Sequence, residues 1–242
     1  MVKPKIWYST GRGLVRMSWN KYNVYNLVHQ PNDIKPRDTV FQQHWKAKKA
    51  TRSYHDADIT ERQWKKIFHA NSKLPSANTG LANKMRDPYG PNYTQPDKDA
   101  NHPAVAALTY AELERRVDFI LFRSHFAPSV YAARQLILHG KVFLNGEKCR
   151  DTGLRVKDMD LIRVQPEAVC TLKGDKNSNL NFSPKPYSQP FMFLPDYLEV
   201  DYKTCSVVFL RQPTSRPRVT EVPSPFNPNV HKLAYEYYIT NK

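Results

Sequence analysis

The chain has 242 residues, 40% of them hydrophobic, which suits one large domain or a compact module with extensions. It contains 19 prolines and eight glycines. Because each proline removes a backbone donor and fixes φ, we expect long segments without regular structure. The net charge is +15, and residues 1–70 hold 14 Lys and Arg against five Asp and Glu. The same segment carries four tryptophans, which favours a polyanionic partner over a solvated basic tail.

The remaining composition argues against several classes of site. The three cysteines, Cys149, Cys170 and Cys205, have no paired spacing, so neither a zinc site nor a disulfide framework is predicted. No apolar run approaches the ~18 residues of a membrane span. The GRG at 11–13 is too short for a phosphate loop. We therefore expect no metal, no cofactor, no membrane contact and no small-molecule substrate.

The N-terminal segment, MVKPKIWYSTGRGLVRMSWNK, is basic, and the first acidic residue is Asp33. This composition resembles that of a mitochondrial transit peptide. Pro4, Gly11 and Gly13 disfavour a regular amphipathic helix, which argues against cleavage. Residues 1–30 are predicted to be irregular or rich in turns.

Two helices are predicted next, over 38–51 and 60–69, where Asp38 and Thr60 are suitable N-caps. Residues 71–103 are dense in Pro, Asn, Asp and Gly, which is typical of a loop or linker. Residues 38–69 should therefore be largely helical and be followed by a long loop.

The most regular pattern covers residues 104–165. It predicts a helix over 109–124 with one apolar side, and a flank that carries Arg116 and Arg123 about 10 Å apart. A second helix is predicted over 129–139, because apolar residues recur there at helical spacing. The pattern therefore predicts two consecutive helices joined by a short break.

Strong local signals bound the second helix and the hairpin after it. Ser129 suits the N-cap, and Gly140 suits a left-handed helix end. The turn pair Asn145-Gly146 predicts a hairpin between strands over 141–144 and 147–150. The region should fold as a small helix-helix-hairpin module.

A further strand over 160–165 is expected to complete that module. The stretch FMFLPDYLEVDYKTCSVVFL predicts two short strands, and 229–239 predicts a final helix. The fold class is therefore α+β. Its expected parts are a basic aromatic N-terminal region (1–70), a loop or linker (71–108), the module (109–166), and a proline-rich C-terminal extension with short strands and a terminal helix (167–242).

Polar residues of the module could form a catalytic cluster, a binding face or a solvated face. Catalysis by His139 would need a carboxylate or nucleophile within reach, and neither Asp118 nor Glu147 is evidently paired with it. His139 could equally be a helix C-terminal residue that stabilises the dipole. Guanidinium and amide donors suit phosphate and ribose, so a nucleic-acid face is favoured. The donors are Arg123, Arg134, Gln135, His139, Lys141, Asn145 and Lys148.

Several short motifs occur at fixed spacing within residues 115–146. Arg116-x-Asp118 lies on the first helix, and Phe-Ala-x-Ser followed by Ala-Arg-Gln covers 126–135. His-Gly and Val-x-x-Asn-Gly then cover 139–146. In these motifs the segment resembles the S-four RNA-binding domain, named after the fourth protein of the small ribosomal subunit.

The flanking segments extend the resemblance to about two thirds of the chain. GRGLVRMSWNKYNVYNL, FLPDYLEVDYKTCSVVFLR and PSPFNPNVHKLAYEYY are similar to mitochondrial members of the family from fungi. Pseudouridine synthases and tyrosyl-tRNA synthetases also carry the domain. Only 76 residues follow the module, too few for a synthase domain, and no HIGH or KMSKS signature occurs.

The resemblance implies a structural constituent of the mitochondrial small ribosomal subunit, in the matrix, that binds small-subunit ribosomal RNA and supports assembly and translation. It also implies the S-five homologue as a neighbour. The alternatives are an RNA-modifying enzyme or a ribosome-associated factor that uses the module for targeting. By resemblance, the RNA contacts are Arg116, Arg123, Ser129, Arg134, Gln135, His139, Lys141 and Asn145. From the charge and aromatic content of the N-terminal region, we add Arg12, Arg16, Lys21, Lys46, Lys48 and Lys49.

Two departures from the family pattern stand out. Lys157-Asp158-Met159-Asp160 replaces the usual Lys-Pro-Gly-Asp before the last strand, so we expect a different turn geometry there. No cysteine precedes Cys149, which excludes the N-terminal zinc cluster of some bacterial members.

Overall fold

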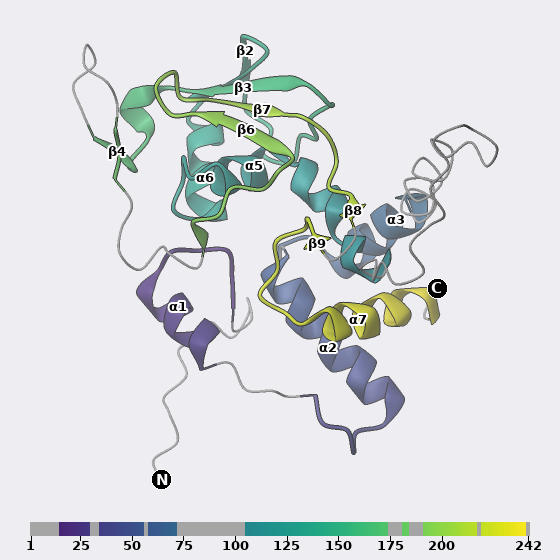
Figure 1. Cartoon of the computed structure of the whole chain (residues 1–242). Helices are drawn as coiled ribbons and strands as arrows, with labels where there is room; N and C mark the ends of the chain where they lie inside the picture. Colours follow the sequence, from purple (N-terminus) through teal and green to yellow (C-terminus); the bar gives the residue numbers. More distant parts are fainter. Residues whose placement is uncertain are drawn as a thin grey trace, which may run out of the picture. The chain divides into compact units, whose positions relative to one another are not determined.

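The chain forms two compact units, seen in a computed structural model (Figure 1). The first unit comprises Met1–Pro31 and Ala111–Gln212, and the second comprises Asn32–Tyr110 and Pro213–Lys242. The four-part division expected from the sequence stays a prediction. The structure describes residues 15–29, 34–55, 58–71, 105–173, 181–183, 191–216 and 219–240.

A five-stranded antiparallel sheet with the order β2-β1-β3-β7-β6 is the centre of the first unit. Two helices, α5 (Val117–Arg123) and α6 (Val130–Leu138), pack together on one face of it (Figure 1). The strands are β1 (Val142–Leu144), β2 (Glu147–Cys149), β3 (Asp160–Val164), β6 (Leu198–Asp201) and β7 (Ser206–Phe209).

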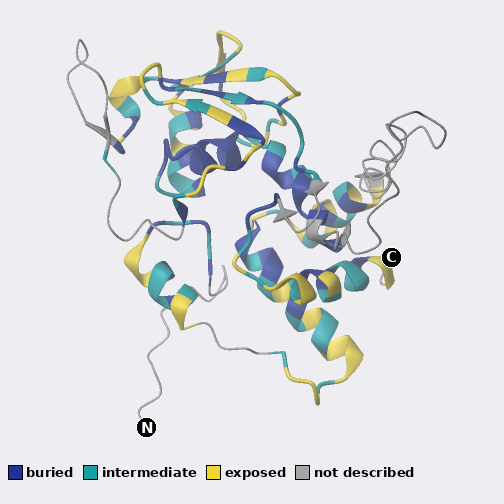
Figure 2. Ribbon diagram, viewed as in Figure 1, coloured by how far each residue is buried: buried dark blue, intermediate teal, exposed yellow. Residues whose placement is uncertain are grey.

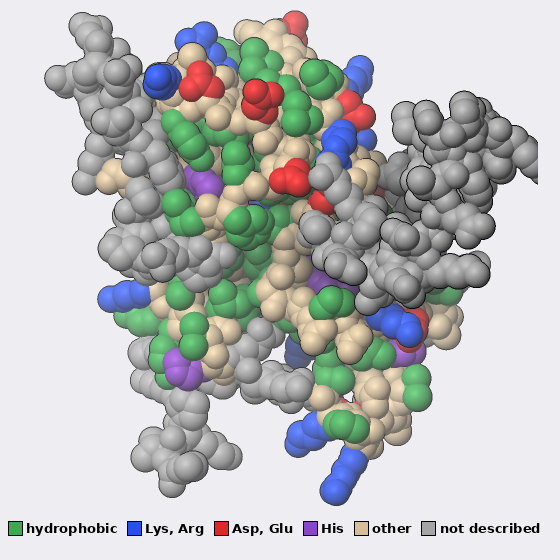
Figure 3. Space-filling model, in the orientation of Figure 1, with side chains coloured by type: hydrophobic (Ala, Val, Ile, Leu, Met, Phe, Trp, Pro, Cys, Tyr) green, Lys and Arg blue, Asp and Glu red, His purple; other side chains and the backbone are tan. Residues whose placement is uncertain are grey.

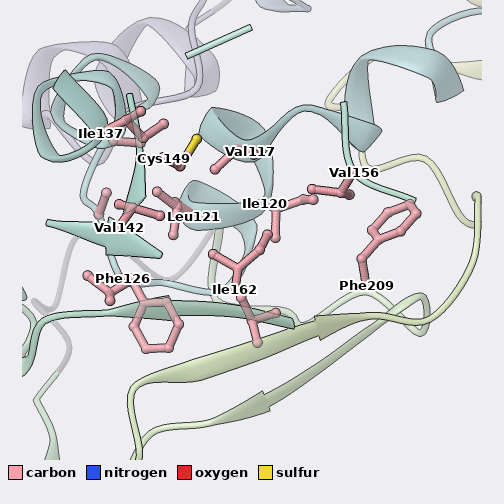
Figure 4. Close-up of a cluster of buried hydrophobic side chains, with 14 of the residues drawn as sticks. Val117, Ile120, Leu121, Phe126, Ile137, Val142, Cys149, Val156, Ile162 and Phe209 are labelled. Atoms are coloured by element: carbon pink, nitrogen blue, oxygen red, sulfur yellow. The ribbon is translucent and has the colours of Figure 1, made fainter. Parts of the chain in front are cut away.

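The alternation of side chains along the strands places the core between this sheet and the two helices (Figure 2). Ile162 points from the sheet toward Ile120 of α5, the ring of Phe209 lies next to Val156, and all four are buried (Figure 4). Burial of apolar side chains on this scale, worth roughly 1.5–3 kcal/mol each, holds the helices on the sheet.

The hairpin forms where the sequence predicts it. Gly140 has a φ of +65° and ends α6 in the left-handed conformation. Asn145 and Gly146 have φ values of 50° and 90°, so both central turn residues adopt the positive φ that a tight hairpin requires. The predicted hairpin is therefore confirmed, with strands shorter than expected.

The helix predicted over 109–124 is interrupted. A 3-10 helix covers Ala111–Arg115, and α5 begins only at Val117. At Arg116 the backbone is extended and forms a bridge with Arg155, while the amide of Val117 donates to the carbonyl of Leu154 at 3.1 Å. Pairing with a distant segment therefore replaces one turn of the expected helix.

The residues before the module are partly helical, contrary to the irregular structure predicted for 1–30. Helix α1 (Lys21–Val28) begins after Asn20, whose side chain caps it by accepting from the amide of Tyr22 at 2.9 Å. Trp19 is buried against Phe122, and its amide donates to the carbonyl of Pro128 at 2.9 Å. Residues 17–19 thus pack on the module. Residues 1–14, which make up most of the transit-like stretch, lie outside the described part.

The C-terminal strands complete the sheet of the first unit. The two strands predicted near residues 191–210 are confirmed as β6 and β7, and β7 pairs with β3 from Asp160 opposite Phe209. His125 ties this segment to the helices, because its ring contacts the Tyr202 hydroxyl at 2.9 Å and the Phe191 carbonyl at 3.0 Å. A short 3-10 helix and a small hairpin lie between: Pro166–Ala168, β4 (Leu172–Lys173) and β5 (Asn181–Phe182).

The second unit is a helical cluster around buried aromatic rings. Trp64, Tyr110 and Tyr238 are fully buried, and Trp64 stacks on Tyr110 with ring centroids 5.2 Å apart. The Thr51 and Tyr110 hydroxyls are hydrogen-bonded at 2.7 Å. The elements are α2 (Val40–Tyr54), α3 (Glu61–Asn71), a 3-10 helix (Val105–Leu108), β8 (Ser215–Arg216), β9 (Val219–Thr220) and α7 (Pro228–Thr240).

The start signals of these helices differ in one place from the prediction. Thr39, not Asp38, caps α2, in a reciprocal capping box with Gln42. Thr60 occupies the expected position before α3, and its hydroxyl accepts from the amide of Gln63 at 3.4 Å. Among the residues that the structure describes, no helix is both long and apolar enough to cross a bilayer.

Candidate nucleic-acid interface

A buried carboxylate organises the arginines of the module. Asp118 is fully buried and accepts two hydrogen bonds from Arg116, at 3.1 and 2.8 Å. Arg134 of α6 donates its Nε to the same carboxylate at 2.8 Å. Two guanidiniums from different elements are thus held by one acceptor, which restricts their side chains before any ligand arrives.

Burial and neighbouring charges have opposite effects on the pKa of Asp118. Burial raises the pKa of Asp118, while the positive charges of Arg116 and Arg134 act in the opposite direction. The side chains of these two arginines are only 11% and 16% exposed. Loss of the carboxylate charge would therefore leave two poorly solvated cations without their acceptor.

The exposed donors follow Arg134 along α6 and into the start of β1. Gln135 and His139 are exposed, and Lys141 is half-buried just before β1. These three positions follow Arg134 within seven residues and share the outward side of the helix and its C-terminal end. Amide, imidazole and ammonium groups in such proximity can donate to phosphate or ribose oxygens.

Two predicted contact residues hold local backbone structure. Ser129 accepts from the amide of Ala132 at 3.1 Å and so caps α6. Asn145 accepts from the amide of Leu161 and donates to Asp160, both at 2.9 Å, which anchors the hairpin turn to β3. The Ser129 and Asn145 side chains therefore fix the backbone next to the donor residues of α6 and β1.

Arg123 does not lie on the expected flank with Arg116. It is 3% exposed and forms a two-point ion pair with the fully buried Glu114, with distances of 3.0 and 2.9 Å. The hydroxyl of Tyr197 donates to the same Glu114 at 2.8 Å. Arg123 therefore supports packing between α5 and the C-terminal segment and presents no surface donor.

The basic N-terminal candidates are dispersed. Arg12 lies outside the described residues. Arg16 is half-buried, and its backbone amide donates to Asn23 at 2.8 Å. Lys21 is exposed, with its ammonium 5.3 Å from the Tyr22 ring centroid. These residues belong to the first unit, whereas the candidates on α2 belong to the second.

The three lysines of α2 differ in their partners. Lys46 pairs with Asp38 at 2.7 Å, and Lys48 pairs with Glu61 at 3.1 Å. Lys49 is exposed, and its ammonium lies 5.3 Å from the Trp45 ring centroid. Only Lys49 of this set has no carboxylate partner among the described residues.

Sequence reasoning missed the shared role of Asp118, which it considered as a motif residue and as a partner for His139 but not as an acceptor for two arginines. The available signal was Asp118 itself, an acid in the first turn of a helix whose other residues are apolar except Arg123. Within the described ranges, no three His, Cys, Asp or Glu residues are grouped as metal ligands. Cys149 and Cys205 are buried and free.

Known proteins resemble this chain both in the module and along its whole length. The S4 domain family matches residues 115–162. The chain is 34% identical to small ribosomal subunit protein uS4m of Schizosaccharomyces pombe, over 100% of this chain and 82% of that protein. It is 29% identical to uS4 of Rickettsia bellii and to uS4 of Cereibacter sphaeroides, each over 81% of this chain and 75% of the relative. The chain therefore belongs to the uS4 family of small-ribosomal-subunit proteins, and it is of the mitochondrial type.

Proposed function

We propose that this chain binds small-subunit ribosomal RNA through the outward side of α6 and the start of β1. As a member of the uS4 family, it is a structural constituent of the mitochondrial small ribosomal subunit and acts in translation without catalysis. Neither alternative, an RNA-modifying enzyme or a transient factor, has support among its relatives. The proposal assigns the RNA contact to residues 109–166.

One observation carries the assignment: the carboxylate of Asp118 fixes Arg116 and Arg134 while Gln135 and His139 stay exposed beside them. A guanidinium that is already oriented loses less side-chain entropy when it meets a phosphate. Lys141 extends the same donor set toward the hairpin. Arg123 is left out of the contact, and Ser129 and Asn145 act by holding the backbone.

The proposal is tested with Gln135→Glu combined with Lys141→Glu. Reversal of Arg116 and Arg134 would crowd acidic groups around buried Asp118 and would test folding instead of binding. We expect the double variant to bind a small-subunit ribosomal RNA transcript at least about tenfold more weakly, with a salt slope that falls by about one. Filter binding over a series of salt concentrations measures both quantities.

The matched control is Lys157→Glu combined with Met159→Glu. It changes the net charge by the same amount at exposed positions of the turn before β3, which contributes no proposed contact. This control should bind the transcript within about twofold of the wild type. Equal losses in the two double variants would mean that only total charge matters, and the assigned face would be wrong.

We also propose the S-five homologue as a protein neighbour and the mitochondrial matrix as the location of the assembled subunit. Both rest on the family resemblance. Cross-linking of intact small subunits, followed by mass spectrometry, would detect peptides of the two proteins joined together. If other neighbouring proteins were cross-linked to this chain but the S-five homologue was not, the proposal of that neighbour would be wrong.

A further inference from the structure

Exposed aromatic rings gather on one side of the second unit. On α2, Phe41 is 60% exposed and Trp45 is 43% exposed, and they lie four residues apart on the same side of the helix. The half-buried Tyr237 of α7 lies beside Phe41, with ring centroids 6.5 Å apart. Large rings left this open form a surface whose burial would be favourable.

Lysines are interleaved with these rings. The ammonium of Lys49 lies 5.3 Å from the Trp45 ring centroid, and that of Lys48 lies 5.0 Å from the Tyr237 ring centroid. We call Phe41, Trp45, Lys48, Lys49 and Tyr237 the α2 aromatic face. Figure 3 shows hydrophobic and basic side chains together near the exposed first turns of α2, at the lower edge of the view.

The charge of this face indicates the class of partner. Helix α2 carries Lys46, Lys48, Lys49 and Arg52 and contains no acidic residue. Lys46 and Lys48 have carboxylate partners, but Lys49 has none among the described residues. The centres of protein–protein interfaces are depleted of lysine, so ammonium groups directly over the rings favour a polyanion.

The exposed aromatic rings indicate whether the bound polyanion is paired or unpaired. In a duplex the base faces are stacked on one another, whereas unpaired nucleotides expose them to aromatic side chains. We propose that the α2 aromatic face binds unpaired RNA, with a base stacked on Trp45 and its phosphate close to Lys49. This proposal rests on the ribosomal RNA binding proposed above and adds a second contact of a different kind, on the other unit.

The test uses the full chain and a short oligouridylate RNA, with a duplex of equal length as comparison. Trp45→Ala should weaken binding to oligouridylate at least about fivefold, because stacking on one aromatic side chain contributes on this scale. Trp45→Phe should retain affinity within about twofold, since it keeps an aromatic face. Lys49→Ala should weaken binding and lower the salt slope by about 0.7.

Fluorescence separates stacking from a general charge effect. Trp19 and Trp64 are 2% and 1% exposed, and Trp7 lies outside the described residues, so only quenching that the Trp45→Phe variant lacks is assigned to Trp45. The matched control is Phe193→Ala, which removes a ring that is 48% exposed on the other unit. It should leave both affinity and quenching unchanged. Thermal unfolding of each variant verifies that it is folded.

Unchanged affinity of Trp45→Ala for oligouridylate, or preference of the wild type for the duplex, would overturn this proposal. If Trp45→Ala impaired incorporation into small subunits without altering RNA affinity, the face would bind a protein, and the proposal would also fail. Failure of the wild type to bind the ribosomal RNA transcript is a separate result, because it would contradict the function proposed for α6 and β1.

Discussion

Asp118 shows how one side chain can serve both stability and recognition. Its carboxylate accepts from Arg116 and Arg134, and it also accepts from the amide of Phe119 at 3.0 Å. The cost of burying a charged group is offset only while these donors are present. A residue that never contacts RNA thereby determines the orientation of two that do under the function proposed here.

We expect Asp118→Asn to lower the free energy of unfolding by about 3 kcal/mol, because two nearly buried guanidiniums lose their anionic acceptor. Urea unfolding measures this change. The control, Asp158→Asn, breaks the pair of Arg115 with an acid whose side chain is 55% exposed, and should cost about 0.5 kcal/mol. If the two variants were equally stable, Asp118 would have no special role.

At the scale of elements, the turn into β3 departs from the family pattern. We expected the geometry of this turn to change where Met159 stands in place of glycine. Met159 has a φ of 69°, which is the left-handed conformation that glycine adopts at least cost, and its amide donates to the carbonyl of Phe209 at 2.7 Å. The Met159 side chain is 68% exposed, so it buries little apolar surface that could offset the backbone strain.

Met159→Gly should therefore raise the free energy of unfolding by about 1 kcal/mol, through relief of backbone strain. Met159→Ala is the matched control, because it removes the same exposed side chain but keeps a Cβ in the strained conformation. The midpoints of urea unfolding compare the two. A glycine variant no more stable than the alanine variant would show that this turn is not strained.

The elements also show which features a sequence can predict. Helix α6 and the hairpin after it were located to within a residue or two because Ser129, Gly140 and Asn145-Gly146 are local signals. The break at Arg116 depends on pairing with Arg155, 39 residues further along the chain, and has no local signature. Burial of Arg123 likewise depends on Glu114 and Tyr197, which the helical pattern alone does not bring together.

On the scale of the whole molecule, the two units combine segments from both ends of the chain. Strands β6 and β7 join the sheet begun by the hairpin, and α7 packs against α2. These pairings were not predictable from periodicity, since each joins segments that are far apart in the sequence. Both helices were nevertheless predicted, over 38–51 and 229–239, because their formation depends on local sequence.

Each unit contains a buried histidine that links stability to pH. In the second unit, His231 is 4% exposed, and its Nε2 contacts the Ser224 hydroxyl at 2.7 Å. Burial lowers the pKa of His231 from 6.5 to about 4. Burial also lowers the pKa of His125 in the first unit. Both imidazoles are therefore favoured in the neutral form in the folded state.

The unfolded chain takes up a proton at His231 near pH 6.5, whereas the folded chain does so only near pH 4. Between these values the unfolded state binds more protons, so stability falls as the pH is lowered, by up to about 3 kcal/mol for this group. His231→Gln keeps a donor near Ser224 but cannot titrate, and it should show a flatter fall in urea stability between pH 6.5 and pH 4. Identical pH profiles for wild type and His231→Gln would mean that acid destabilisation arises elsewhere, with buried His125 as the next group to substitute.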